Sequence, residues 1–477
     1  MFLGIDLGTS GVKLCLAEER GVIATATAPL TLGSPHPGWS EQSPDAWWDA
    51  TRAAAARLPD SARRRVRAIG LSGQMHGAVL LDAQHRPVRP AILWNDNRAQ
   101  NDGRRLSRRM PDIGQRAGVP PLPGFTAPKL MWLAREEPDV HARIAHILLP
   151  KDYIGLMLHG GIATDRSDAA GTLWLDQASR AWDPDLARAS DTEPGWLPPL
   201  HDGQEVVGRL RPGAASALGL PHGVPVVAGG GDAATGAISL GATEPGRGFI
   251  SLGTSGQLFL ADRAYRPRPD RMVHAFAHTI PDRWYQMAAM LNGARPIAWL
   301  AERLSVTPGE VVALAETADP GRLPIFLPYL TGERSPHGDP EIRAGFFGIE
   351  EATGRAELSR AVLEAVAFTF ADAVESFGDS MTSQESLLAI GGGTRSDLLL
   401  QWIAEATGKR IGRAEAAEAG PAWGAARLAA CGAGALSLAD LGEVPEVRHW
   451  FDPAPAPALH DRLRRFRALY RAVKDLR

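Results

Sequence analysis

Two aspartates each follow an apolar stretch and precede residues with small side chains. Asp6 follows the run that begins at Phe2, and Asp232 follows segment 225–231, whose last three residues are glycines. A carboxylate with so few polar neighbours can face a substrate hydroxyl as a general base. Phosphoryl transfer uses such a pair, with one carboxylate near Mg²⁺ and the other orienting the attacking hydroxyl. The alternative for Asp232 is a structural cap on the helix expected after it.

Turns rich in Gly, Ser and Thr recur along the chain. The segment 7–11 (LGTSG) lies beside Asp6, and a third glycine-rich segment, 390–397 (IGGGTRSD), follows a short apolar run. Backbone N–H groups in such turns can hold phosphate oxygens. The Walker A spacing is absent at Gly8 and Gly253, so a nucleotide site here requires another architecture. An ordinary tight turn is the alternative interpretation of each segment.

The first of these turns has an internal copy. The segment 7–11 recurs as 252–256, again after apolar residues, which indicates duplicated domains. Chance recurrence in a glycine-rich chain is the alternative. The copies differ in chemistry, because Ser251 stands where the first copy has Asp6. The Glu-Pro-Gly punctuation at 244–246 predicts a boundary that gives domains 1–243 and 244–477.

Local patterns predict the elements that hold these residues. The expected N-terminal hairpin has strands in 2–5 and 12–16, and Ser43 and Pro44 mark a helix start. Further predictions are a strand, turn and strand over 67–81, a helix from near Asp96, helical character at 129–133 and an amphipathic terminal helix. The arginines of the terminal helix, 457–477, are expected to form a solvated face, and this helix is free to pack back on the first domain.

Composition excludes several classes of protein. The chain has 477 residues, 44% hydrophobic and 22% charged, with a formal charge of -3. Neither nucleic acid nor an anionic membrane is therefore an expected partner. Cys15 and Cys431 are far apart, so no disulfide framework or zinc site is predicted. With no secretory leader or membrane span expected either, the sequence predicts a cytoplasmic protein that acts on small molecules.

Motifs along nearly the whole chain resemble those of the FGGY carbohydrate kinases, which belong to the actin-like ATPase superfamily. Two long segments, 124–136 and 344–364, are similar to the defining patterns of that family. The shorter matching segments are 4–13 (GIDLGTSGVK), 73–77 (GQMHG), 93–96 (LWND), 149–153 (LPKDY), 251–256 (SLGTSG), 327–337 (LPYLTGERSPH) and 420–428 (GPAWGAARL).

The resemblance implies a fold and a set of site residues. The fold would be two α/β domains of actin-like, ribonuclease-H-like topology with the active site in the cleft between them. Asp232 would accept a proton, Asp6 would support Mg²⁺ and the phosphates, and Met75 and His76 would contact a sugar. Outside the GQMHG context, His76 would be interpreted as an ordinary loop residue. The residues implied to bind ATP are Thr9, Ser10, Lys13, Thr254, Gly392, Gly393 and Asp397.

One residue departs from the family pattern. Ala233 follows the expected catalytic aspartate, where kinases of this kind that act on D-xylulose usually have asparagine. D-xylulose is the first expected acceptor, and another pentulose, a deoxy-ketose or a polyol is the alternative. A non-sugar ATPase of the same fold, such as a chaperone or filament protein, is the competing class. We also expect the domains to close on sugar, slow ATP hydrolysis without sugar, and a homodimer as a further option.

Overall fold

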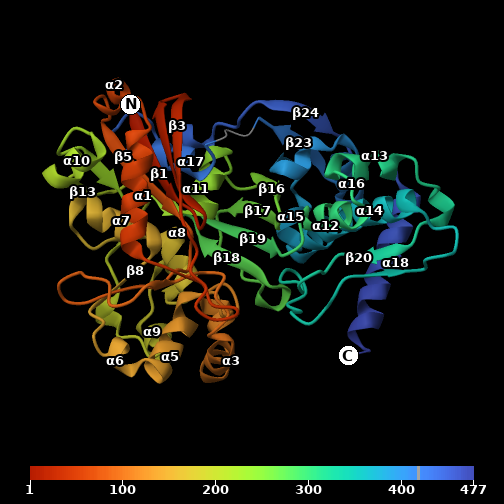
Figure 1. The fold of residues 1–477 in the computed structure, drawn as a ribbon, viewed down its shortest axis with the longest axis horizontal. Helices are drawn as coiled ribbons and strands as arrows, with labels where there is room; N and C mark the ends of the chain where they lie inside the picture. The colour runs from red at the N-terminus through yellow and green to blue at the C-terminus, as the bar shows by residue number, and fades with distance from the viewer. Residues whose placement is uncertain (416–418, 477) are drawn as a thin grey trace.

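The computed structural model describes residues 1–415 and 419–476. Figure 1 shows two lobes side by side, with the N-terminal half of the chain in one lobe and most of the C-terminal half in the other. Each lobe is built around a mixed β-sheet with helices packed on it. No helix in these described ranges combines the length and apolar character that a membrane span requires.

The first sheet holds the predicted N-terminal hairpin. β1 (Phe2–Leu7) and β2 (Gly11–Glu18) pair antiparallel, and β1 pairs with β5 (Ala68–Gly73) in parallel. The strand-turn-strand predicted over 67–81 is also present, as β5 and then β6 (Val79–Leu81). In spatial order the sheet contains β13 (Val206–Arg209), β14 (Pro225–Val227), β5 (Ala68–Gly73), β1 (Phe2–Leu7), β2 (Gly11–Glu18) and β3 (Gly21–Pro29), with β15 (Gly230–Gly231) also paired to β5.

Helices cover both faces of this sheet. On one face Leu3, Ile5 and Leu7 pack in a core with Trp47, the tryptophan that the sequence places in the helix after Ser43. The helices of that face are α1 (Pro44–Ala56), α7 (Pro150–His159) and α10 (Pro212–Leu218). The other face carries α11 (Asp232–Ser239) and α17 (Pro421–Gly432).

α17 reaches the first sheet from the far end of the chain, as its blue ribbon among red strands shows (Figure 1). It packs so closely that a Cβ atom at Gly4 would lie 1.8 Å from the carbonyl oxygen of Ala422, and one at Gly70 would lie 2.0 Å from that of Ala425. Only glycine allows this approach. The first structural domain is therefore completed by residues beyond 243, which the predicted boundary does not include.

A smaller, mostly helical region lies within the first domain. Its core is continuous with buried aromatic residues of the second domain, including Phe276 and Tyr285. The helix expected from near Asp96 begins later, at Gln100, and the one expected around 129–133 spans Thr126–Glu136. The helices here are α3 (Gln100–Arg109), α4 (Ile113–Arg116), α5 (Thr126–Glu136), α6 (Pro138–His141), α8 (Arg166–Ala169) and α9 (Pro184–Ala189). The short strands are β7 (Ala91–Ile92), β8 (His146–Leu148), β9 (Thr164–Asp165), β10 (Leu175–Asp176), β11 (Ala181–Trp182) and β12 (Leu200–His201).

The second sheet repeats the central part of the first, a hairpin with a parallel strand beside it, and differs at the edge next to that hairpin. Its central hairpin is formed by β16 (Gly248–Leu252) and β17 (Gly256–Asp262), and the second LGTSG copy runs from the end of one strand to the start of the other. β16 pairs in parallel with β22 (Ser386–Ile390). In spatial order the strands are β18 (Val273–Ala277), β19 (Trp284–Met290), β17 (Gly256–Asp262), β16 (Gly248–Leu252), β22 (Ser386–Ile390), β23 (Arg410–Ala414) and β24 (Val447–Phe451). Its helices are α12 (Arg295–Leu304), α13 (Pro308–Glu316), α14 (Arg355–Ser376), α16 (Asp397–Thr407) and α18 (Pro457–Lys474), beside a hairpin of β20 (Ile325–Leu327) and β21 (Gly345–Phe347).

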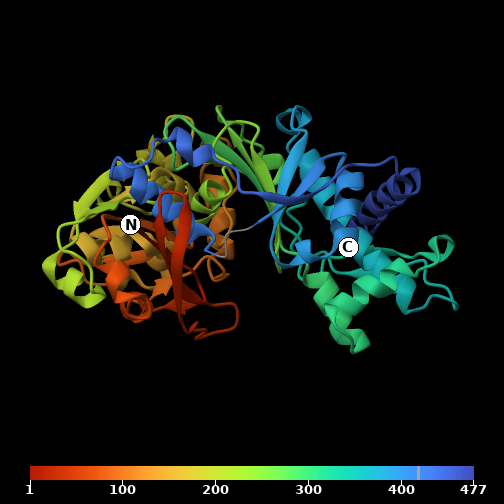
Figure 2. The same cartoon turned by 90° about the horizontal axis from the view of Figure 1, so that it is seen from above.

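The terminal helix α18 is amphipathic as predicted, and Leu459, Leu463, Phe466 and Tyr470 are its buried side chains. These residues pack against α14, α16 and β20 of the second domain. Figure 2 places the helix at the outer edge of that lobe, away from the first domain. The helix therefore does not pack back on the first domain, because its apolar stripe matches the core of the second.

Candidate functional site

Asp6 lies at the end of β1, where two neighbouring strands bring it polar partners. In the parallel pair with β5 it is in register with Ser72, whose hydroxyl donates a hydrogen bond of 2.9 Å to Asp6 Oδ1. Lys13 lies opposite Asp6 in the antiparallel pair with β2. Burial raises the pKa of Asp6 to about 6, against the opposing effects of Ser72 and Lys13.

Asp232 is brought to the same edge of the sheet by the glycines before it. Gly230 and Gly231 pair with the end of β5, and α11 then begins at Asp232 itself. Its Oδ1 accepts a hydrogen bond of 2.8 Å from the N–H of Ala233, while Oδ2 has no hydrogen-bond partner among the described residues. The carboxylate therefore keeps one oxygen available, even though it stands at the helix start that the capping alternative requires.

Hydrogen bonds and charge connect Asp232 with Asp6. The Ser72 hydroxyl, which binds Asp6, lies 2.7 Å from the hydroxyl of Thr235, one turn along α11 from Asp232. Solvent reaches the Asp232 side chain, but the surrounding protein lowers its hydration. This desolvation and, next, the charge of Asp6 raise the pKa of Asp232 to about 7. A carboxylate with this pKa is suited to accept a proton near neutral pH.

Met75 and His76 follow β5 on the same side of the molecule. Met75 packs on the strand that carries the aspartate, since a Cβ atom at Gly231 would lie 2.8 Å from Met75 Cγ. His76 has a φ of 69°, and its Nδ1 lies 2.8 Å from the carbonyl oxygen of Gly171. A carbonyl can only accept, so Nδ1 carries the proton. Burial lowers the pKa of His76 to about 3, so the ring is neutral and its Nε2 is a hydrogen-bond acceptor.

The first glycine-rich turn joins β1 to β2. The Thr9 hydroxyl donates to Gln74 Oε1 and accepts from Trp94 Nε1, both at 2.9 Å. This hydroxyl is therefore engaged, and a phosphate here would meet the backbone N–H groups of the turn instead. Ser10 is exposed at its tip, and its carbonyl accepts from the N–H of Leu30.

The predicted nucleotide residues of the second domain fall into two groups. Thr254 ends its hairpin turn beside the glycines after β22, where a Cβ atom at Gly393 would lie 2.9 Å from Leu252 Cβ. Gly392 borders open space, since an added Cβ atom would meet no described atom within 4 Å. Asp397 is turned away to form an ion pair with Arg413 on β23. The structure thus places Gly393 against Leu252, two residues before Thr254, and pairs the Asp397 side chain with Arg413.

Several residues around His76 are not predicted from the sequence. Lys129 is buried on α5 and donates a hydrogen bond of 2.7 Å to the carbonyl oxygen of His76. His274 on β18 is 1% exposed, and both its ring nitrogens lack a hydrogen-bond partner among the described residues. Phe125 lies between the two histidines, with ring centroids 4.4 Å from His76 and 5.7 Å from His274. Lys129 lies within a matched family segment, but a lone histidine such as His274 carries no local signal.

The described side chains do not form a complete metal cage. Within 1–415 and 419–476, no group of three or more His, Cys, Asp and Glu residues is arranged to hold an ion. Mg²⁺ in ATP-using enzymes is commonly held by one or two carboxylates, with waters and substrate phosphates as the other ligands. Asp6, with Oδ1 bound to Ser72 and Lys13 opposite it, fits the role of such a single protein ligand.

Two mixed sheets with the same central hairpin and parallel neighbour, each with a glycine-rich hairpin turn, define a two-domain α/β protein of the actin-like ATPase class. Residues 1–239 match the model of the FGGY family of carbohydrate kinases, N-terminal domain, and residues 248–433 match that of the C-terminal domain. The chain belongs to the FGGY family of carbohydrate kinases.

Individual relatives are similar in sequence to this chain over most or all of its length. A xylulose kinase of Escherichia coli (strain K12) is 43% identical over 100% of both chains, and one of Bacillus subtilis (strain 168) is 36% identical over 91% of this chain and 88% of its own. Among solved structures, a xyloylose kinase from Brucella ovis has a TM-score of 0.96 at 41% identity and covers 100% of both chains. The xylulose kinase from Rhodospirillum rubrum has a TM-score of 0.92 at 31% identity, over 100% of this chain and 99% of its own.

Proposed function

We propose that this chain transfers the terminal phosphoryl group of ATP to a hydroxyl of a small ketose, with D-xylulose as the first choice of acceptor. Relatives that bear the name xylulose kinase support this choice, because the similarity to them extends over both domains. The observation that carries the proposal is the pair of carboxylates at one sheet edge, where Asp232 Oδ2 has no hydrogen-bond partner among the residues that the structure describes.

Asp232 acts as the general base in this proposal. Its Oδ2 accepts the proton of the sugar hydroxyl while the hydroxyl oxygen forms a bond to the γ-phosphorus. The bond from the γ-phosphorus to the oxygen that bridges to the β-phosphate breaks, and ADP leaves with that oxygen. Because solvent reaches Asp232, the proton can pass to water afterwards. Its raised pKa of about 7 makes the carboxylate a better proton acceptor than an ordinary aspartate.

Asp6 acts, through Mg²⁺, on the negative charge that develops on the phosphates during phosphoryl transfer. Mg²⁺ bound with ATP would neutralise part of the phosphate charge, and Asp6 would hold it on the protein side. Ser72 fixes the Asp6 carboxylate through Oδ1. The hydrogen bond between Ser72 and Thr235 ties this position to α11, which begins with Asp232. The metal-supporting and proton-accepting carboxylates are thereby held in one framework.

Met75 and His76 provide the sugar side of the site. The neutral His76 ring offers Nε2 as an acceptor for a sugar hydroxyl, because Nδ1 is committed to Gly171. Ala233 offers no side-chain hydrogen bond next to the base. A missing hydrogen bond costs about 0.5 to 1.5 kcal/mol of binding free energy and allows acceptors with fewer hydroxyls. A deoxy-ketose, another pentulose or a polyol is therefore the second choice of acceptor.

In this proposal ATP binds between the two glycine-rich hairpins. The backbone around Thr9 and Ser10, with Lys13, would contact phosphates from the first domain. Thr254, Gly392, Gly393 and Asp397 would contact the nucleotide from the second. Closure of the cleft between the domains on sugar binding would exclude water and keep ATP hydrolysis slow in the absence of sugar. The free cysteines Cys15 and Cys431 fit a reducing, cytoplasmic location for this activity.

The test is a coupled ADP-release assay with a panel of acceptors that includes D-xylulose, other pentuloses, deoxy-ketoses and polyols. The wild-type chain should release ADP rapidly with D-xylulose and slowly with no sugar. Asp232→Asn should lower kcat by at least about 100-fold, the usual scale for losing a general base, while ATP binding measured by calorimetry persists. Equal rates with and without every sugar, or near-normal kcat in the variant, would contradict the proposal.

A further inference from the structure

A buried charge cluster lies next to the proposed base without belonging to either binding site. Lys151 at the start of α7 is fully buried, and its Nζ contacts three carboxylates. Nζ is ion-paired with Asp152, lies 3.0 Å from Asp165 Oδ1 and lies 3.6 Å from Asp168 Oδ2. A buried carboxylate is strongly disfavoured without a cation beside it, so Lys151 is the group that holds the three carboxylates together.

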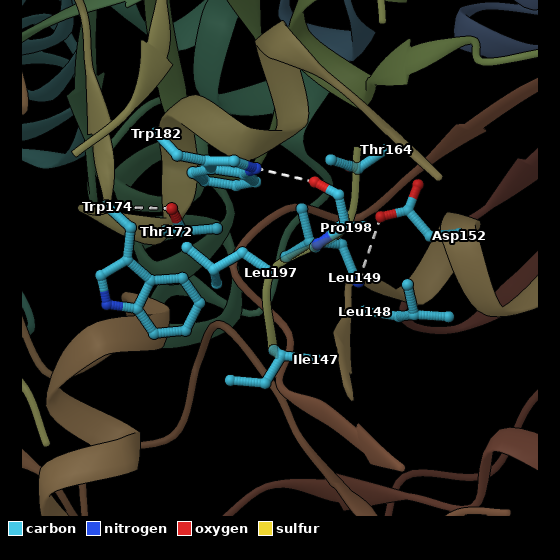
Figure 3. Close-up of a pocket in the computed structure, with 10 residues that line it drawn as sticks. All are labelled: Ile147, Leu148, Leu149, Asp152, Thr164, Thr172, Trp174, Trp182, Leu197 and Pro198. Carbon is cyan, nitrogen blue, oxygen red and sulfur yellow. Dashed lines mark hydrogen bonds between the residues drawn. The ribbon is translucent and has the colours of Figure 1, made fainter. Parts of the chain in front are cut away.

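The cluster is closed to ligands. In Figure 3, Asp152 accepts a hydrogen bond from the backbone N–H of Leu149, at 3.2 Å, beside a cavity lined mainly by apolar side chains. That cavity has a volume of only about 10 Å³, enough for about one water molecule. Asp165 and Asp168 are also buried. The charges can therefore act on the protein but not on a substrate.

A short chain of hydrogen bonds leads from this cluster to the short strand that directly precedes Asp232. Asp165 Oδ2 accepts from the Ser167 N–H at 2.7 Å and from the Ser167 hydroxyl at 2.5 Å. With its proton committed to Asp165, the Ser167 oxygen accepts from the N–H of Gly231 at 3.1 Å. Gly231 is the residue directly before Asp232. The backbone position of the base is thus connected through Ser167 to a fixed, buried ion cluster.

The hydrogen bond from Gly231 to Ser167 matters because the backbone before Asp232 consists of glycines. The segment before Asp232 consists of three glycines, which restrict the backbone less than any other residue. Its neighbours provide other fixed points, since Thr279 donates to the carbonyl oxygen of Gly229 and the Thr235 hydroxyl lies 3.1 Å from the carbonyl oxygen of Gly231. Ser167 is the residue that holds the Gly231 N–H. A catalytic group must be held to within about 0.5 Å, and a shift of about 1 Å can lower the rate about 100-fold.

We propose that Ser167, oriented by Asp165 and Lys151, is a positioning residue that fixes Gly231 and thereby sets the location of the Asp232 carboxylate. This inference rests on the proposed role of Asp232 as the base. Ser167 is fully buried, so its removal should affect turnover rather than nucleotide binding.

The experiment compares Ser167→Ala with Ser190→Ala as a matched control. Ser190 is equally buried and hydrogen-bonded, to Trp174 Nε1 at 2.8 Å, and has no described bond to the strand before Asp232. Amide hydrogen exchange is followed in the peptide covering 226–236, and steady-state kinetics with D-xylulose and ATP are measured on the same samples. Both readouts refer to folded protein, so a general loss of stability does not imitate the expected pattern.

Ser167→Ala should speed exchange at Gly231 and lower kcat at least about tenfold, with KM for ATP within about twofold of wild type. Ser190→Ala should change neither. Unchanged exchange in the 226–236 peptide, or an unchanged kcat despite faster exchange, would overturn the inference. If the wild-type chain phosphorylates no sugar, the proposed function fails, whereas the exchange data still decide whether Ser167 anchors Gly231.

Discussion

The two central hairpins have the same strand connectivity and different chemistry. In the first, Asp6 is in register with Lys13 on one neighbour and Ser72 on the other. In the second, Ser251 occupies the equivalent place, in register with Gln257 and Ile390. Both copies retain a Gly-Thr-Ser turn at the same end of the hairpin. The duplicated framework therefore preserves backbone groups suited to phosphate, while the carboxylate is confined to one copy.

The neighbouring strands extend this difference. β5 leads into the Met75 and His76 turn and pairs with the glycines before Asp232. Its counterpart β22 leads instead into glycines 391–393, packed on the end of β16. One domain thus collects titratable groups and the residues proposed to contact the sugar, and the other collects the backbone surface proposed to contact the nucleotide. If these proposals hold, catalysis requires both domains, because neither hairpin alone has both features.

The strongest test of this asymmetry compares Asp6→Asn with Ser251→Ala. Asp6→Asn removes the negative charge expected to support Mg²⁺, and kcat should fall by about 100-fold, the scale for losing one electrostatic group in an active site. Ser251→Ala at the equivalent place should change kcat by less than about twofold. Coupled ADP release at saturating sugar and ATP measures both, and thermal melts confirm that each variant is folded. Similar losses in the two variants would show that the hairpins share the catalytic role.

The pH profile gives the next largest effect. Burial and the charge of Asp6 raise the pKa of Asp232 to about 7, and only the ionised carboxylate can accept a proton. With Asp232 as base, kcat/KM for the sugar should fall about tenfold per pH unit below 7 and level off above it.

Asp6→Asn is also the control for the assignment of this titration. Removing a negative neighbour makes Asp232 easier to ionise, so the midpoint should move to lower pH. Initial rates between pH 5 and 9 provide the measurement. A midpoint that stays near 7 in Asp6→Asn would assign the titration to a group other than Asp232.

Local sequence signals predicted the elements around the site well. Alternating apolar residues and glycine turns predicted both hairpins, which the two sheets contain, and the predicted two-domain α/β fold is confirmed. The resemblance of the motifs to the FGGY kinases is confirmed by the family match. The roles of Asp232, Asp6, Met75, His76 and the nucleotide residues stay predictions.

Features that depend on distant segments could not be read from the sequence. α17 packs on the first sheet because Gly4 and Gly70 leave room for its backbone, a match between residues more than 350 positions apart. The Lys151 cluster likewise draws on separate elements, and no spacing rule connects Lys151 to Ser167 and Gly231. α18 has the apolar stripe that periodicity predicts, but periodicity does not specify which domain covers it.

The smallest expected effect concerns Gly392, in the domain that we propose binds the nucleotide. A methyl group added at Gly392 would meet no described atom within 4 Å, so Gly392→Ala should leave the fold and its stability unchanged. If ATP lies against this backbone, the same methyl group would hinder it and weaken about one hydrogen bond, raising KM for ATP about two- to tenfold. KM for the sugar should stay constant, because Met75 and His76 belong to the other domain.

Gly213→Ala is the control, since an added Cβ atom there also meets open space, on α10 of the first domain. Equal KM values for ATP in both variants would place the nucleotide away from Gly392, and the second hairpin would then need another explanation for its open glycine surface.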